Sequence, residues 1–86
     1  MITVYTKLSC PYCDMAKKLL QSKNINYKEV RVDLDNEARE FLLSQGHRSV
    51  PQLYLNDDLF VEGGYQGLAA LSEQELMSKL GIQNVN

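Results

Sequence analysis

Ile2-Thr3-Val4-Tyr5-Thr6 is followed after three residues by Cys10-Pro11-Tyr12-Cys13. Apolar and polar residues alternate from Ile2 to Thr6 and include β-branched and aromatic types, a pattern that predicts a strand. Pro11 suits the first turn of a helix, where its missing N–H is not needed. The period then changes, and one helical face collects four apolar residues: Met15, Ala16, Leu19 and Leu20. The sequence therefore predicts a strand-to-helix junction that carries both cysteines of the chain.

The spacing of the two cysteines predicts redox chemistry. Residues one helical turn apart have Cα atoms about 5–6 Å apart, within reach of a disulfide. Free N–H groups and the macrodipole at a helix start favour thiolate over thiol. Cys10 is the expected nucleophile, with Lys7 upstream to favour the anion, and Cys13, one turn further in, is the expected resolving thiol. We interpret the pair as the centre of a thiol–disulfide oxidoreductase that acts through a mixed disulfide.

Length and charge narrow the class of protein. Eighty-six residues predict a single domain, 1–86, and the net charge of −2 gives no support for general nucleic-acid binding. No stretch is apolar enough to span a bilayer, and a strand from Ile2 leaves no room for a signal peptide. We therefore expect a cytoplasmic protein, and nothing in the sequence points beyond a monomer. In that compartment a lone Cys-x-x-Cys is catalytic or metal-binding more often than a structural staple.

The rest of the chain predicts an α/β order, β-α-β-α-β-β-α. A four-stranded mixed sheet with helices on both faces would resemble a thioredoxin-like fold, with the dithiol at the carboxyl end of the first strand. The signals that mark the elements are as follows: a strand at 27–32 after Asn24; a helix capped by Asp35 or Asn36, burying Ala38, Phe41 and Leu42 and ending at Gly46; strands at 50–55 and 59–62 around a hairpin turn at 56–58; a helix opened by Gly63-Gly64; and a last helix with a Ser72–Glu75 capping box, stopped by Gly81.

Three further features have both a structural and a functional interpretation. Pro51 in Ser49-Val50-Pro51 fits a strand start, and the residues alone favour a trans bond, since about 5–6% of X–Pro bonds are cis. Gly63-Gly64 allows a turn, which is the favoured interpretation, or exposed N–H groups for a carboxylate. Tyr12 is equally a surface aromatic or a ring beside the reacting sulfur.

Taken together, these motifs resemble a dithiol glutaredoxin. The resemblance rests on Tyr5-Thr6-Lys7, Cys10-Pro11-Tyr12-Cys13, Ser49-Val50-Pro51 and Gly63-Gly64-Tyr65, which occur in order between Ile2 and about Leu80. It implies glutathione as reductant and mixed-disulfide partner, with no resident metal. It also implies disulfide-containing or glutathionylated proteins as substrates, with ribonucleotide reductase among the candidates.

The resemblance assigns the glutathione groove residue by residue. Lys7 and Tyr12 would line it, Val50 would pair through its backbone with the cysteinyl part, and Pro51 would be cis. The γ-glutamyl carboxylate would meet Gly64 and the N–H groups of Tyr65 and Gln66. The glycyl carboxylate would meet one of two basic residues, Arg39 or Arg48.

The sequence departs from the family pattern at two positions. Ser49 stands where many glutaredoxins have Thr, a mild change. Gly67 stands where many relatives have an Asp that pairs with the γ-glutamyl ammonium. Loss of one charged hydrogen bond costs on the order of 1–3 kcal/mol, so weaker glutathione binding or a different reductant is expected from this change.

Three alternatives stay open from the sequence. A glutaredoxin-like protein reduced by thioredoxin reductase keeps the dithiol but lacks glutathione affinity, and Gly67 favours it slightly. A zinc or iron–sulfur module is disfavoured because two cysteines and His47, expected in a solvated loop, give at most three N/S ligands, and Pro11 argues against it. A purely structural domain is disfavoured by the intact dithiol.

Overall fold

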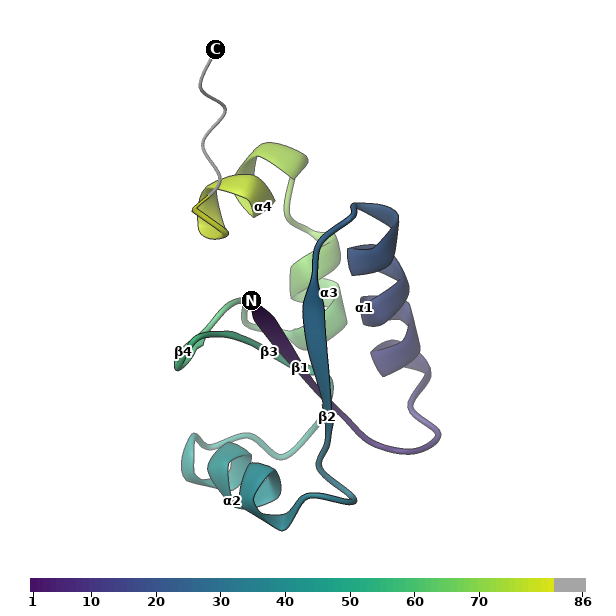
Figure 1. Cartoon of the computed structure of the whole chain (residues 1–86), viewed down its shortest axis with the longest axis vertical. Helices are drawn as coiled ribbons and strands as arrows, with labels where there is room; N and C mark the ends of the chain where they lie inside the picture. Colours follow the sequence, from purple (N-terminus) through teal and green to yellow (C-terminus); the bar gives the residue numbers. More distant parts are fainter. Residues whose placement is uncertain (82–86) are drawn as a thin grey trace.

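A computed structural model describes residues 1–81 (Figure 1). The elements follow the chain in this order: β1 (Ile2–Thr6), α1 (Pro11–Ser22), β2 (Tyr27–Arg31), α2 (Asn36–Ser44), β3 (Gln52–Leu55), β4 (Asp58–Leu59), α3 (Gly64–Ala69) and α4 (Glu73–Lys79). The strands form one sheet in the order β2-β1-β3-β4. β1 is parallel to β2 and antiparallel to β3, and β4 is antiparallel to β3. The predicted four-stranded mixed sheet is confirmed.

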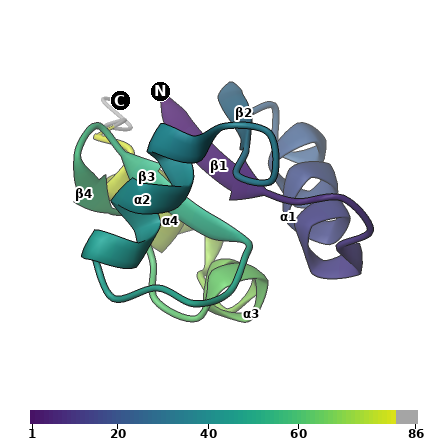
Figure 2. The same cartoon turned by 90° about the horizontal axis from the view of Figure 1, so that it is seen from below.

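Alternation along β1 sends its side chains to two faces of the sheet, and each face has its own helices. Ile2 and Val4 are fully buried beneath α1 and α3. On the opposite face Tyr5 contacts Phe41 of α2, with ring centroids 5.8 Å apart, and both rings contact Tyr54. Figure 1 shows α1 and α3 together on one side of the strands and α2 on the other, and Figure 2 views the sheet from the α2 end. The thioredoxin-like arrangement predicted from the sequence is therefore confirmed.

Local capping signals form where the sequence predicts them. The Asp35 carboxylate accepts the Ala38 N–H at 3.1 Å and begins α2. Ser72 and Glu75 form the predicted capping box at the start of α4. Asn24 ends α1 with a φ of 56°, the left-handed conformation that a short polar side chain tolerates.

The second half of the sheet is shorter than predicted. A strand was expected over 59–62, whereas β4 is only Asp58–Leu59. The Phe60 N–H still bonds to the Leu53 carbonyl at 2.8 Å, but the Phe60 ring turns into the core and pairing ends there. The two helices predicted after Gly63-Gly64 and at the Ser72–Glu75 capping box both form, as α3 and α4. Met15, expected on the buried face of α1, is 42% exposed because Ala16 and Leu20 occupy that face.

Gly67 lies at the tightest backbone contact of α3. A Cβ at this position would overlap the Glu62 carbonyl oxygen and would lie 3.0 Å from the Val61 side chain. The Gly67 N–H also bonds back to the Gly63 carbonyl at 3.3 Å, which closes the first turn of the helix. The absence of a side chain at Gly67 thus lets the 61–63 turn pass directly over α3.

This contact reverses the usual effect of replacing glycine in a helix. Alanine in a helix interior is ordinarily more stable than glycine by roughly 0.5–1 kcal/mol. Here we expect Gly67→Ala to lower the free energy of unfolding by about 1–3 kcal/mol, because the new methyl must displace backbone. Urea unfolding measures the change, with Ala69→Gly at an exposed position of the same helix as the control for propensity alone. A more stable Gly67→Ala protein would contradict the packing described.

Candidate active site

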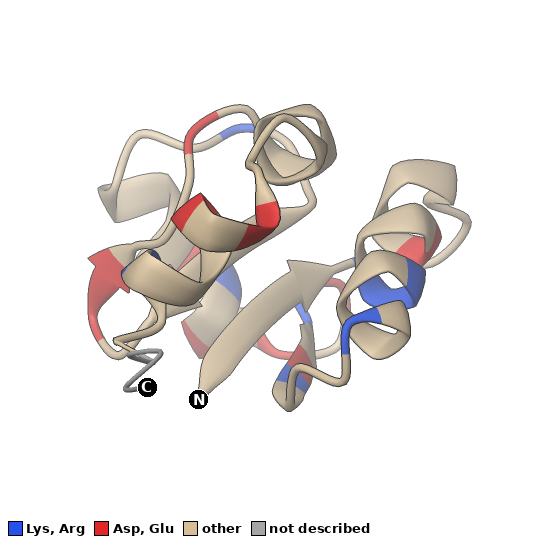
Figure 3. Ribbon diagram, turned by 90° about the horizontal axis from the view of Figure 1, so that it is seen from above, with Lys and Arg blue, Asp and Glu red and all other residues tan. Residues whose placement is uncertain are grey.

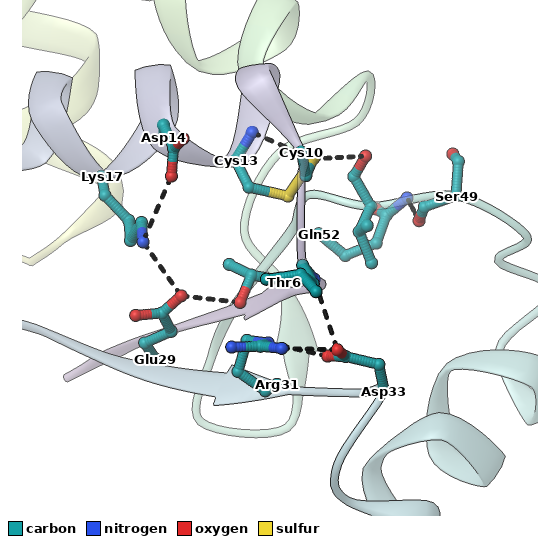
Figure 4. The surroundings of a disulfide bond; sticks show 12 residues. Thr6, Cys10, Cys13, Asp14, Lys17, Glu29, Arg31, Asp33, Ser49 and Gln52 are labelled. Atoms are coloured by element: carbon teal, nitrogen blue, oxygen red, sulfur yellow. Dashed lines mark hydrogen bonds and ion pairs between the residues drawn. A yellow bond between two sulfur atoms is a disulfide. The ribbon is translucent and has the colours of Figure 1, made fainter.

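Cys10 and Cys13 lie at the junction of β1 and α1 and form a disulfide (Figure 4). Cys10 is the N-cap residue of α1, with extended backbone, and Pro11 is the first helical residue, as predicted. The Cys13 N–H donates to Cys10 Sγ at 3.2 Å, and the Cα atoms are 5.2 Å apart. Cys10 is 8% exposed and Cys13 1%, so Cys10 is the more accessible sulfur. Cys10 was predicted to be the more exposed of the two cysteines, and it is.

The Val50-Pro51 segment reaches the dithiol from a distant part of the chain. Cys10 Sγ lies 3.8 Å from the Val50 carbonyl oxygen. The Val50–Pro51 bond is cis, as the resemblance implied and contrary to the expectation from the residues alone. Gln52 donates from its side-chain amide to the Ser49 carbonyl at 2.9 Å, which fixes this turn (Figure 4). The backbone of residues 49–52 is therefore held beside the reactive sulfur.

Gly64 joins the third motif to the same place. A Cβ on Gly64 would lie 2.7 Å from the Pro51 carbonyl oxygen, so glycine is required for the close approach of α3 to this segment. Gly64 also has a φ of 57°, which glycine adopts without steric cost. The three motifs predicted to act together are thus brought together by the fold, through backbone contacts that the sequence alone did not specify.

Two cavities flank the Val50-Pro51 segment. The first, of about 350 Å³, is lined by three basic residues, Lys7, Arg39 and Arg48, and by one acidic residue, Asp33, together with Val50 and apolar residues of α2. None of these three cations forms an ion pair within residues 1–81. Elsewhere in residues 1–81, Lys and Arg residues are mixed with Asp and Glu residues along the backbone (Figure 3). Both arginines that the sequence left as alternatives therefore line one cavity with Lys7.

The second cavity, of about 680 Å³, shares Val50 with the first and is also lined by Pro51. It is lined by Tyr12, Glu62, Gly64, Tyr65 and Gln66, among others. The rings of Tyr12 and Tyr65 lie 6.0 Å apart and Tyr12 is 50% exposed, so an open aromatic wall borders the cavity. All the residues that the resemblance assigned to a ligand groove lie at the two cavities or between them.

The loop between β1 and α1 is tied to the segment that follows β2. The Leu8 N–H lies 3.4 Å from the Asp33 carboxylate, which also pairs with Arg31 (Figure 4). The Arg31 guanidinium is the main cause that lowers the pKa of Asp33 to about 2, and the Leu8 N–H contributes. Ser9 takes a φ of 57° where the loop turns into the helix. These contacts set the position of the loop that carries Lys7.

A polar network that sequence reasoning missed lies beside the dithiol. Thr6, fully buried at the end of β1, donates to Glu29 at 2.7 Å, and Lys17 contacts the same carboxylate at 3.0 Å and Asp14 at 3.5 Å (Figure 4). The Thr6 hydrogen bond and the Lys17 ammonium lower the pKa of Glu29. The network ties β1, β2 and α1 together near the helix start that carries the two cysteines (Figure 4). Its signal in the sequence, a Thr ending an otherwise apolar buried row, identifies no partner.

His47 lies in a loop, as predicted, but its side chain is half-buried and bonded to another residue instead of being solvated. Its Nε2 lies 2.7 Å from the Tyr54 hydroxyl, and the two rings meet edge to face with centroids 5.7 Å apart. Tyr54 is buried with its hydroxyl in need of a partner, and His47 supplies it from the loop after α2.

Among residues 1–81, no three His, Cys, Asp or Glu side chains gather as metal ligands would. In the same range, no helix has the length and apolar character needed to cross a membrane.

A redox-active dithiol that caps a helix at the carboxyl end of a central strand, beside a cis-proline turn, defines a thioredoxin-like thiol–disulfide oxidoreductase. The Glutaredoxin family model matches residues 2–60. Glutaredoxin 1 of Rickettsia conorii is 40% identical over 82 residues, which cover 92% of this chain and 78% of that protein. The chain belongs to the glutaredoxin family.

Solved structures agree with that assignment. The solution structure of glutaredoxin from Brucella melitensis superposes with a TM-score of 0.71 at 30% identity, covering 92% of this chain and 85% of that one. The glutaredoxin-like NrdH-redoxin from Escherichia coli, described as having a thioredoxin-like activity profile, superposes with a TM-score of 0.61 at 31% identity. That similarity covers 63% of this chain and 71% of the redoxin.

The low pKa of Glu29 generates a pH-dependent prediction. A carboxylate whose pKa is lowered in the folded state adds stability that is complete above its unfolded pKa of about 4.3. That stability is lost as the pH falls through the folded-state value. We expect Glu29→Gln to lower the free energy of unfolding by about 1 kcal/mol at neutral pH, because the ion pair between Glu29 and Lys17 is partly exposed.

Urea unfolding of both proteins across acidic and neutral pH measures this difference. We expect the two stabilities to converge in strongly acidic buffer, where Glu29 is protonated. Glu40→Gln, at an exposed position of α2, is the control for loss of one surface charge. A Glu29→Gln deficit that is the same at every pH would contradict a contribution from the ionised network.

Proposed function

We propose that this chain is a glutathione-dependent oxidoreductase that reduces protein disulfides and glutathione mixed disulfides. The observation that carries the proposal is the position of Cys10. Its sulfur receives the Cys13 N–H at the start of α1 and lies 3.8 Å from the carbonyl of Val50, a residue that lines both cavities. The amino end of the helix stabilises a thiolate there, and the backbone of residues 49–51 is available to an extended ligand.

The cycle begins with the reduced protein. The Cys10 thiolate attacks one sulfur of the substrate disulfide, forms a mixed disulfide and releases the other substrate sulfur as a thiolate. The Cys13 thiolate then attacks Cys10 Sγ, which closes the intramolecular disulfide and releases the reduced substrate after protonation. The 5.2 Å separation of the two Cα atoms lets this second step proceed within one helical turn.

Two glutathione molecules return the protein to the dithiol form. The first thiolate attacks Cys10 Sγ, forms a mixed disulfide with Cys10 and frees Cys13. The second attacks the glutathione sulfur of that mixed disulfide, releasing glutathione disulfide and the Cys10 thiolate. Electrons balance, because two thiols are oxidised to one disulfide while one protein disulfide is reduced.

The two cavities supply groups suited to the bound glutathione. In the proposed pose Lys7, with Arg39 and Arg48, receives the glycyl carboxylate, and the three unpaired cations in one cavity support this assignment. The cysteinyl backbone pairs with Val50. The γ-glutamyl end lies in the second cavity, against Gly64 and the N–H groups of Tyr65 and Gln66, with the Tyr12 ring alongside.

Similarity to the NrdH-redoxin supports a second candidate, a redoxin reduced by thioredoxin reductase. It would use the same Cys10–Cys13 chemistry without a glutathione site, and Gly67 is the residue that favours it. Under both candidates a protein disulfide is the substrate, and the family resemblance makes ribonucleotide reductase a candidate.

The experiment that separates the two candidates compares reductants. Oxidised protein is mixed either with glutathione or with NADPH and thioredoxin reductase, and the appearance of free thiols is followed. We expect rapid reduction by glutathione, with turnover of a glutathionylated peptide. Reduction only by the reductase would refute glutathione dependence and leave the dithiol chemistry in place.

The division of labour between the cysteines predicts different losses in two variants. We expect Cys10→Ser to abolish all activity, because no other thiol is accessible at the helix start. Cys13→Ser should lose protein-disulfide reduction but retain release of glutathione from a glutathionylated peptide, which needs only Cys10. Both activities are measured for each variant under the same conditions. Equal loss of both activities in the two variants would contradict the assigned roles.

A further inference from the structure

The second cavity has an acidic residue that the family resemblance does not assign. Glu62 is the only Asp or Glu among the described residues that line this 680 Å³ space, and no Lys or Arg lines it. Glu62 is exposed, and its carboxylate makes no hydrogen bond or ion pair within residues 1–81. A single uncommitted negative charge therefore borders the cavity in which the γ-glutamyl end is proposed to lie.

The structure also explains why that charge does not come from position 67. Relatives that have Asp there need room for its Cβ, and in this chain the Glu62 carbonyl oxygen fills that space. An acidic side chain at Gly67 would require the 61–63 turn to move away from α3. Glu62 thus excludes a side chain at position 67 through its carbonyl and supplies an acidic side chain to the lining of the cavity.

The ligand end proposed for this cavity carries two opposite charges. The γ-glutamyl group of glutathione has an α-carboxylate and an α-ammonium on one carbon, so a complementary site needs hydrogen-bond donors and an anion close together. Gly64, Tyr65, Gln66 and Glu62 all line this cavity. His47, the remaining titratable base at the cavity, is engaged with Tyr54.

We infer that Glu62 recognises the α-ammonium of glutathione and so determines specificity for this reductant in place of an acid at position 67. The inference rests on the proposed function. Because Glu62 is exposed, its ion pair with the ligand should contribute as little as other surface ion pairs do. We expect it to change the rate constant for reduction by glutathione about threefold. The effect should decrease as salt is added, since exposed charges are screened.

The test pairs one variant with one altered ligand. Second-order rate constants for reduction of the oxidised protein are measured for wild type, Glu62→Gln and the control Glu40→Gln, which removes an exposed charge on α2. Each protein is reduced by glutathione and by an analogue in which hydrogen replaces the α-amino group. Acid quenching, alkylation and mass spectrometry follow the free thiols.

The inference predicts a loss confined to one combination. Glu62→Gln should be about threefold slower than wild type with glutathione and equal to wild type with the analogue, whereas Glu40→Gln should match wild type with both. Equal rates for Glu62→Gln and wild type with glutathione would overturn the inference. So would an equal loss with both reductants, which would indicate a structural effect. Failure of glutathione to reduce the wild type would instead overturn the proposed function, and this inference with it.

Discussion

The hydrogen bond from the Cys13 N–H to Cys10 Sγ is the interaction on which the site depends. It makes the reactive sulfur the cap of α1, so the same contact begins the helix and offers a partner for negative charge on the sulfur. Pro11 supports this geometry because its ring suits the first helical position. Structure and chemistry therefore have one origin at this junction.

The rest of the fold holds three distant segments against that junction. The parallel pairing of β1 with β2 places the dithiol at the carboxyl end of a central strand. β3 begins directly after Pro51, which sets Val50 against Cys10, and Gly64 packs on Pro51 from the other side. Each contact involves backbone atoms, so the geometry depends on glycine and proline at these positions more than on any particular side chain.

Local patterns were sufficient to predict most of the elements. Pro11, Asp35 and the Ser72–Glu75 box each act within one helical turn, and each begins a helix where the sequence indicates. No single motif predicted how the site is assembled. The motifs did so only in combination, through their resemblance to the glutaredoxin family.

What the sequence could not predict depends on contacts between distant residues. His47 pairs with the Tyr54 hydroxyl, and Thr6 with Glu29, across different elements. β4 ends at Leu59 because the next residue, Phe60, places its ring in the core. Gly67 was interpreted only as a missing acid, whereas the structure also gives it a packing role against Glu62. Periodicity describes one element at a time and contains no information about these pairings.

The pKa of the Cys10 thiol in the reduced protein reports directly whether the start of α1 stabilises the thiolate. The rate of Cys10 alkylation by iodoacetamide is followed against pH, with Cys13 resolved as a separate peptide by mass spectrometry. A capped helix start predicts that Cys10 reacts first and titrates well below the free-cysteine value of about 8.5. If Cys10 titrates at that ordinary value, or reacts after Cys13, the start of α1 does not stabilise the Cys10 thiolate.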